Sequence, residues 1–272
     1  LTATLSPPPP PGADTDATVT FTDSDGVEIV SSWSFVLDYK TVDAANRQPG
    51  PGTQRGFTVR VVQAPAGTPG FTNNINEAEA QLAPNSTIPK YYDLTTVQQR
   101  INFSQDGPGS ANGHFADDAL VPGLNVPANG SDEIAMEILT YLELTQGSYR
   151  FGVTSDDGYK IMAGSSPGDM GAPILAVHAS GTADEAFDFV VPATGFYPFR
   201  MVWFEHGGGA HVEWYSVNMT TGARTLINDP SVPSAVKAWV GVEEAPAIVL
   251  QSTASLTAAF ADEAGATIDT GA

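Results

Sequence analysis

Apolar and polar residues alternate along most of this 272-residue chain. In two stretches, 149–153 and 197–203, a large apolar side chain falls at nearly every second position. Successive side chains of a β-strand point to opposite faces of its sheet, so a period of two predicts half-buried strands. The alternation predicts a shared core that includes Tyr149, Phe151, Val153, Phe199, Met201, Trp203 and Trp214.

Shorter alternating runs occupy residues 17–62, and a turn sequence, Asp23-Ser24-Asp25-Gly26, separates the first two of them. Short strands joined by turns at this spacing predict a small immunoglobulin-like sandwich. A run of five prolines, Pro7 to Pro11, favours a stiff polyproline II spacer after a first short strand at 1–5. Residues 76–82 form the one segment with a helical pattern, and Asn74 is its expected N-cap.

The order of these patterns predicts an all-β protein of two domains, because no β-α-β alternation occurs. We expect an immunoglobulin-like domain at 1–92, including the N-terminal strand and the proline-rich spacer. A larger antiparallel β-sandwich is expected at 93–240. Residues 241–272 are expected to form a separate strand segment.

Charge narrows the range of partners. The chain has 31 acidic and 11 basic residues and a formal net charge of −20, which argues against binding nucleic acid or an anionic membrane. Carboxylates suit divalent cations such as Ca²⁺, although acidity also keeps an extracellular protein soluble. The absence of cysteine excludes disulfides and thiolate metal sites, and no apolar run is long enough to span a membrane. Few lysines and abundant Thr, Ser, Gly and Pro indicate a secreted protein, at the cell surface or in an extracellular fibre.

Three motifs follow one another in the second half of the chain. They are Ser155-Asp156-Asp157-Gly158 after an aromatic strand, Tyr197-Pro198-Phe199-Arg200, and Glu205-His206-Gly207-Gly208-Gly209-Ala210. In combination they resemble the family of the anthrax-toxin protective antigen N-terminal domain, which also includes yeast flocculins, epithelial adhesins, bacterial adhesins and some glycosidases. The resemblance covers about residues 97–240 and implies a carbohydrate-binding β-sandwich.

The resemblance also implies a site. In the lectin members of that family, two adjacent aspartates joined by a cis peptide hold a Ca²⁺ ion that bridges to sugar hydroxyls. Asp156 and Asp157 match that pair, and the loop after the long strand would supply further ligands, with Glu205 and His206 where lectins often have Asn or Gln. The implied glycan-binding positions are Asp156, Asp157, Glu205, Gly207 and Gly208. The alternative interpretation is a tight turn, which Asp and Gly also favour.

Other candidate sites are weaker. Asp117-Asp118 is a second carboxylate pair that could hold a cation, but a solvated loop is the better interpretation. His206, His211 and Glu213 lack any spacing typical of zinc sites. The chain has no nucleophile elbow, phosphate loop or dinucleotide fingerprint, so we expect it not to be an enzyme.

Three classes of function remain open: a surface module that binds glycan through calcium, a subunit or repeat of an extracellular fibre, and an accessory module of a secreted glycosidase. Residues 260–268 repeat the pattern of 21–29, with Phe, Asp, Gly and Ile in register. One hypothesis is that the tail, 248–268, pairs as a strand with another copy and completes that copy's N-terminal sandwich, so that a head-to-tail filament can grow. The alternatives are that the tail begins the next repeat of a longer polypeptide or folds back on its own second domain.

Overall fold

The computed structural model describes residues 25–26, 40–68, 72–124 and 130–243, and the backbones of 15–22, 28–35, 251–252 and 261–262. The expected strand at 1–5, the proline spacer at 7–11 and most of the tail at 248–268 lie outside the described residues. Among the described helices, none is long and apolar enough to cross a membrane.

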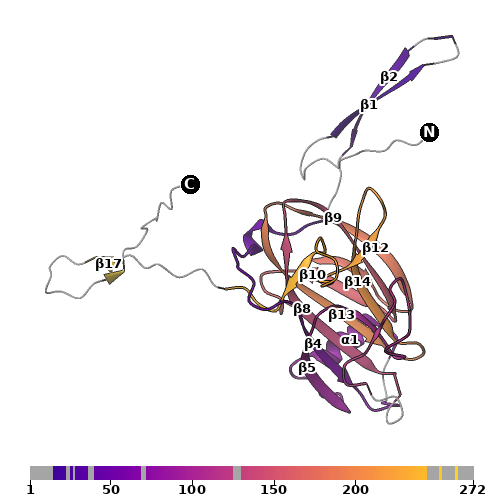
Figure 1. The fold of residues 1–272 in the computed structure, drawn as a ribbon, viewed down its shortest axis with the longest axis vertical. Coiled ribbons are helices and arrows are strands. Elements are labelled where there is room, and N and C mark those ends of the chain that lie inside the picture. The colour runs from indigo at the N-terminus through magenta and orange to yellow at the C-terminus, as the bar shows by residue number, and fades with distance from the viewer. Residues whose placement is uncertain are drawn as a thin grey trace.

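Two seven-stranded sheets face each other and form a β-sandwich (Figure 1). The first sheet has the order β11-β10-β13-β8-β4-β5, and β16 also pairs with β8. Its strands are β4 (Phe57–Gln63), β5 (Tyr92–Gln98), β8 (Ile134–Leu144), β10 (Tyr159–Ala163), β11 (Ile174–His178), β13 (Gly195–Glu205) and β16 (Lys237–Trp239).

The second sheet has the order β3-β12-β9-β14-β6-β7, and β15 also pairs with β14. Most neighbours are antiparallel, as predicted, but β3 with β12 and β6 with β7 are short parallel pairs. Its strands are β3 (Lys40–Thr41), β6 (Asn102–Ser104), β7 (Ala119–Leu120), β9 (Gly147–Asp156), β12 (Ala183–Val191), β14 (His211–Val217) and β15 (Arg224–Leu226).

The predicted boundary between residues 92 and 93 is wrong. Strand β4 pairs with β8 along six positions and with β5 on its other side, and β3 pairs with β12. Residues from Lys40 onward therefore belong to the same sandwich as the second half of the chain. The reason is that a period of two identifies a strand but not its partner, and β4 finds its partner some 75 residues away.

The predicted core is confirmed. Phe151, Val153, Phe199, Met201, Trp203 and Trp214 are buried between the sheets, and Tyr149 packs against them while half-buried. The aromatic rings contact one another; those of Phe151 and Trp214, for example, lie 6.3 Å apart edge to face. Truncating such a buried aromatic side chain to alanine costs about 3–5 kcal/mol. The two sheets thus provide a rigid frame for the loops at their ends.

The predicted helix is also confirmed as α1 (Ile75–Leu82), and the Asn74 side chain caps it by accepting a hydrogen bond from the Asn76 amide. A short 3-10 turn at Ala44–Asn46 precedes β4. Helix α1 lies beside the first sheet (Figure 1). Its apolar residues pack on that sheet in a second cluster of Val62, Ile75, Ala78, Leu82, Ala135, Val202 and Phe204.

Two further pairs of strands lie outside the sandwich sheets. Strands β1 (Thr15–Thr22) and β2 (Glu28–Phe35) form the expected antiparallel hairpin, and β17 (Gln251–Ser252) pairs with β18 (Ala261–Asp262). An immunoglobulin-like domain needs more strands than this hairpin, so that part of the interpretation stays a prediction.

Candidate metal centre

The Ser-Asp-Asp-Gly motif lies at one end of the sandwich. Asp156 is the last residue of β9, and Gly158 precedes β10. The amide of Asp157 donates to the carbonyl of Phe204 at 3.0 Å, which extends the pairing of β10 with β13. This pairing brings Glu205, the last residue of β13, beside the two aspartates.

The turn has the backbone that the resemblance implied. The peptide bond between Asp156 and Asp157 is cis. Gly158 follows because a Cβ atom there would lie 2.4 Å from the carbonyl oxygen of His178 and 2.9 Å from the Phe204 ring. Only glycine allows so close an approach between the turn, the neighbouring loop and β13.

Three carboxylates meet at this turn. One oxygen from each of Asp156, Asp157 and Glu205 lies within 4.8 Å of the others. Asp157 is 3% exposed and Glu205 is 1% exposed, while Asp156 is half-buried. Among the residues that the structure describes, these three form the one such group of potential metal ligands.

The two aspartates are held by neutral donors. The Asp157 carboxylate accepts hydrogen bonds from the Asn73 side chain at 2.7 Å and from the His206 backbone amide at 2.9 Å. Asp156 accepts one from the Thr182 hydroxyl at 3.2 Å, and its backbone carbonyl accepts one from the Trp203 indole. These contacts orient the carboxylates without neutralising their charge.

Glu205 differs from both aspartates, because neither of its buried oxygens accepts a hydrogen bond of standard geometry. Burial raises the pKa of Glu205 to about 8, and the charges of Asp157, Asp156 and Asp132 add to the effect; a poorly aligned Gly207 amide opposes it weakly. Burial and the neighbouring Asp157 also raise the pKa of Asp156. A buried charge without a partner is costly, and a bound cation would remove that cost.

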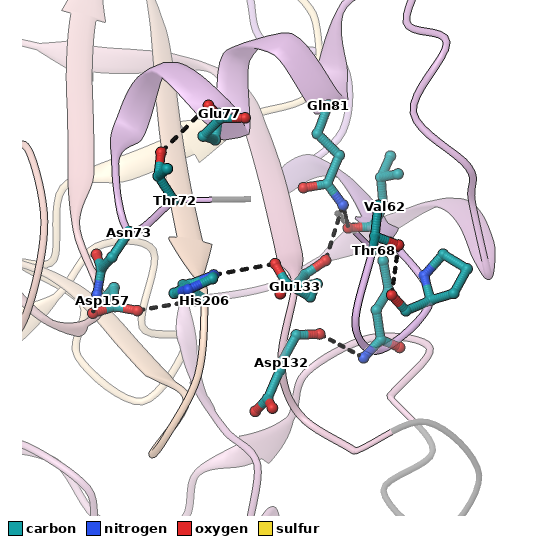
Figure 2. Close-up of polar contacts among 12 residues, drawn as sticks. Val62, Thr68, Thr72, Asn73, Glu77, Gln81, Asp132, Glu133, Asp157 and His206 are labelled. Carbon is teal, nitrogen blue, oxygen red and sulfur yellow. Dashed lines mark hydrogen bonds and ion pairs between the residues drawn. The ribbon is translucent and has the colours of Figure 1, made fainter. Parts of the chain in front are cut away.

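The other predicted site residues divide into two kinds. The His206 ring lies apart from the three carboxylates and contacts Glu133, with Nδ1 3.2 Å from Oε2 (Figure 2). Gly207 and Gly208 form the loop after β13, and Gly208 has a positive φ of 120° with no atom near its missing side chain. His206, which was predicted as a metal ligand, therefore contacts the site through its backbone amide, which donates to Asp157. Gly207 and Gly208 add no side chains to the loop after β13.

The other acidic and histidine residues do not join this group. Asp118 is buried, and one of its oxygens accepts hydrogen bonds from Ser110 and the Asn112 amide. Glu213 accepts hydrogen bonds from the backbone amides of His114 and Phe115, which fixes the 105–118 loop over the second sheet. Within the described ranges, His206, His211 and Glu213 form no metal-ligand group.

Asn73 and Thr182 were missed by the sequence analysis, although both contact the candidate ligands. The capping pattern identified Asn74 but contained no signal for its neighbour Asn73. Thr182 lies in the loop between β11 and β12, 26 positions beyond Asp156, and no local spacing links the two.

Comparisons with known proteins found that the fold of this chain is similar to those of several solved structures. No protein-family model and no curated protein matches the chain. Among solved structures, it is similar to the A domain of epithelial adhesin 9 from Candida glabrata in complex with Galb1-4GlcNAc, with 15% identity and a TM-score of 0.49, over 74% of this chain and 96% of that chain.

Two PA14 domains are similar as well. The PA14 sugar-binding domain from an RTX adhesin has 19% identity and a TM-score of 0.45, over 64% of this chain and 96% of that one. The PA14 domain of the MpAFP antifreeze protein has 16% identity and a TM-score of 0.46, over 70% and 96%.

Proposed function

We propose that this chain is a non-catalytic, extracellular adhesive module whose sandwich binds Ca²⁺ through Asp156, Asp157 and Glu205 and binds glycan at that site. The main support for this proposal is Glu205. Its buried carboxylate oxygens have no hydrogen-bond partner of standard geometry, and it lies beside two further carboxylates. Such a group of hard, anionic oxygens suits Ca²⁺ among the common biological cations.

The glycan part of the proposal rests on chemistry and access. When bound, Ca²⁺ can complete its coordination with a pair of sugar hydroxyls. Gly207, Gly208 and Gly209 follow Glu205 in the chain, and a Cβ atom at Gly209 would lie 3.5 Å from Asp156 Oδ2, so this loop adds no side chain beside the carboxylates. Asp156 is half-buried, so the cluster has an exposed side.

The position of the site in the sandwich supports an adhesive role. Gln48 pairs with Phe196 near the start of β13, and Gly52 pairs with Val242 close by. Glu205 ends the same strand, and an eleven-residue strand spans about 36 Å. Lys40 and Glu243, the first and last described residues of the sandwich, therefore lie toward the end opposite the candidate site.

We further propose that the module serves in a fibre or surface array. The edge of β5 supports this, because among the described residues β5 pairs with β4 on one side and with no strand on the other. Open sheet edges accept added strands. In a head-to-tail exchange, the tail at 248–268 would be the added strand. Removing the residues after Val242 should then abolish the assemblies that the full chain forms. Electron microscopy of both chains would measure this.

Calcium binding is tested by titration calorimetry on the metal-free chain with CaCl₂. We expect saturable binding with one site and a rise in melting temperature, since a cation that binds only the folded state stabilises it. The Asp157→Asn variant should lose both responses. A parent chain that shows no heat and no thermal shift up to millimolar Ca²⁺ would contradict the proposal.

Terbium offers a test that locates the site. Trp203 Nε1 lies 3.2 Å from the carbonyl oxygen of Asp156, so bound Tb³⁺ should luminesce when tryptophan is excited. We expect Ca²⁺ to quench this signal by competition and Asp157→Asn to remove it. Glycan binding is then tested on a glycan array with and without EGTA; signals that survive EGTA would contradict the calcium-dependent mode.

A further inference from the structure

Asn73 joins two parts of the candidate metal centre. Its side-chain Nδ2 donates to Asp157 Oδ1 at 2.7 Å, and its Oδ1 accepts a hydrogen bond from the Gly181 amide at 3.2 Å. Figure 2 shows the amide of Asn73 pointing at the Asp157 carboxylate, with the His206 backbone on the other side. One side chain thus bridges the cis turn and the loop between β11 and β12.

That loop also holds the second aspartate. Thr182, one residue after Gly181, donates its hydroxyl to Asp156 Oδ1 at 3.2 Å. The amide of Ile75 donates to the carbonyl of Ala179 at 2.8 Å, so the start of α1 docks on the same loop. Asn73 therefore affects Asp157 directly and Asp156 through the position of this loop.

Helix α1 gives Asn73 a rigid base. Glu79 in the middle of the helix accepts two hydrogen bonds from the Arg200 guanidinium, at 2.7 and 2.8 Å, and also pairs with Lys160. Ile75, Ala78 and Leu82 pack on β4, β8 and β13. The helix is thus fixed to the first sheet by ion pairs and by apolar contacts.

The chemistry of an amide suits this position. Each oxygen of Asp157 accepts one hydrogen bond, from Asn73 and from the His206 amide respectively, and retains a lone pair for a metal ion. A lysine or arginine would orient the carboxylate equally well but would neutralise the charge that attracts a cation. Asparagine fixes the carboxylate and leaves its charge intact.

We infer that Asn73 is a positioning residue of the cation site, which holds the Asp157 carboxylate in the orientation that binds Ca²⁺. This inference rests on the proposed function. Outer partners that orient metal ligands contribute about 10- to 100-fold in metal affinity. Replacing Asn73 should therefore weaken Ca²⁺ binding without removing any of the three carboxylates.

The chain contains a matched control in the next residue. Asn74 caps α1, and its side chain accepts a hydrogen bond from the Asn76 amide within the helix, whereas that of Asn73 reaches the carboxylate. We expect Asn73→Ala to raise the Kd for Ca²⁺ about tenfold or more in calorimetry. Asn74→Ala should lower the melting temperature of the metal-free chain, because a lost cap destabilises a helix, while keeping Kd within about twofold of the parent.

A second readout reports the coordination itself. The luminescence lifetimes of bound Tb³⁺ in H₂O and D₂O give the number of water molecules on the ion. If Asp157 turns away in Asn73→Ala, about one further water should bind Tb³⁺. Loss of helix stability alone would not change this number, so Asn74→Ala should match the parent. If Asn73→Ala does not fold, Asn73→Ser, which is too short to bridge both partners, replaces it.

The outcomes separate the two proposals. A parent chain that binds neither Ca²⁺ nor Tb³⁺ overturns both. A parent that binds, with an unchanged Kd in Asn73→Ala, overturns the role of Asn73 and leaves the proposed function standing. Equal weakening in Asn73→Ala and Asn74→Ala would assign the effect to general loosening of α1 and would also overturn that role.

Discussion

Two carboxylates beside β13, the partly buried Glu79 next to its middle and the buried Glu205 at its end, are treated in opposite ways by this protein. Glu79, on α1, contacts Arg200 and Lys160, and Arg200 also contacts Glu137. Glu205, at the end of β13, has no hydrogen-bond partner and lies beside Asp156 and Asp157. Burial would raise the pKa of both carboxyl groups, but Arg200 and Lys160 hold that of Glu79 below its ordinary value.

The difference indicates what each region is for. At Glu79 the fold supplies its own cations, so the cost of burying charge is offset inside the molecule. At Glu205 the fold places three carboxyl groups together without a cation of its own, so ionising Glu205 costs free energy in the metal-free chain. Sites that bind ligands commonly carry such perturbed groups. The protein is therefore internally satisfied under α1 and incomplete at the end of the sandwich.

The largest effect is expected from breaking the satisfied region. Arg200 is 2% exposed and serves two glutamates, so Arg200→Met leaves Glu79 and Glu137 without their main partner. Removing one member of a buried ion pair costs about 3–5 kcal/mol. We expect a loss of that size in the free energy of unfolding, measured with urea on the metal-free chain.

Arg150→Met is the matched control for this loss. Arg150 makes an equally regular pair of hydrogen bonds with Asp188, both at 2.7 Å, but its side chain is 41% exposed. Exposed pairs are worth less than about 1 kcal/mol. Equal losses in the two variants would show that burial does not set the value of these pairs.

The opposite sign is expected at the incomplete region. Burial raises the pKa of Glu205 to about 8, so at pH 7 folding of the metal-free chain forces this carboxyl group, ionised in the unfolded chain, to take up a proton. Glu205→Gln removes that cost, so the metal-free chain should become more stable by about 1–3 kcal/mol, as each unit of pKa shift is worth about 1.4 kcal/mol. The same variant should bind Ca²⁺ at least tenfold more weakly, because one of three anionic ligands becomes neutral. Urea unfolding with and without Ca²⁺ measures both. A destabilised metal-free variant would remove the contrast with Arg200.

Sequence patterns predicted the parts of this molecule that depend on neighbouring residues. Alternation predicted the core strands around Phe151 and Trp203, and the capping pattern predicted α1. The motif that carries the family resemblance led to Asp156, Asp157 and Glu205, which the structure brings together.

The rest depends on contacts between distant segments, which local patterns do not encode. Strand β4 joins the sandwich only through its pairing with β8, so the boundary at residue 92 was wrong. His206 follows Glu205 directly, but it lies beyond the end of β13 and its ring contacts Glu133 instead of the carboxylate group. Asn73 reaches a carboxylate 84 positions away.

The stability that Glu79 contributes should depend on pH. Its pKa is lowered in the fold, so its ionised form contributes stability that is present above the ordinary pKa of about 4.5 and is lost as pH falls through the lower, folded value. We expect the difference in unfolding free energy between the parent and Glu79→Gln to be largest near neutral pH. It should shrink steadily below about pH 4.5. A difference that grows on acidification would mean that Arg200 and Lys160 do not stabilise the charged form.

The smallest change in unfolding free energy is expected for a substitution of Asp93. The pKa of this carboxyl group is strongly lowered, but a shifted pKa alone does not imply a large contribution to stability. Arg60 donates two hydrogen bonds to its carboxylate, each at 2.9 Å, and Lys90 donates a third at 2.7 Å, so these cations lower the pKa of Asp93. The Asp93 side chain is nevertheless 33% exposed, and water and salt screen all three contacts. Asp93→Asn should therefore cost less than about 1 kcal/mol in urea unfolding, and the loss should shrink further in 1 M NaCl. A loss equal to that of Arg200→Met, or one that salt leaves unchanged, would mean that geometry rather than burial decides which carboxylates of this protein matter for its stability.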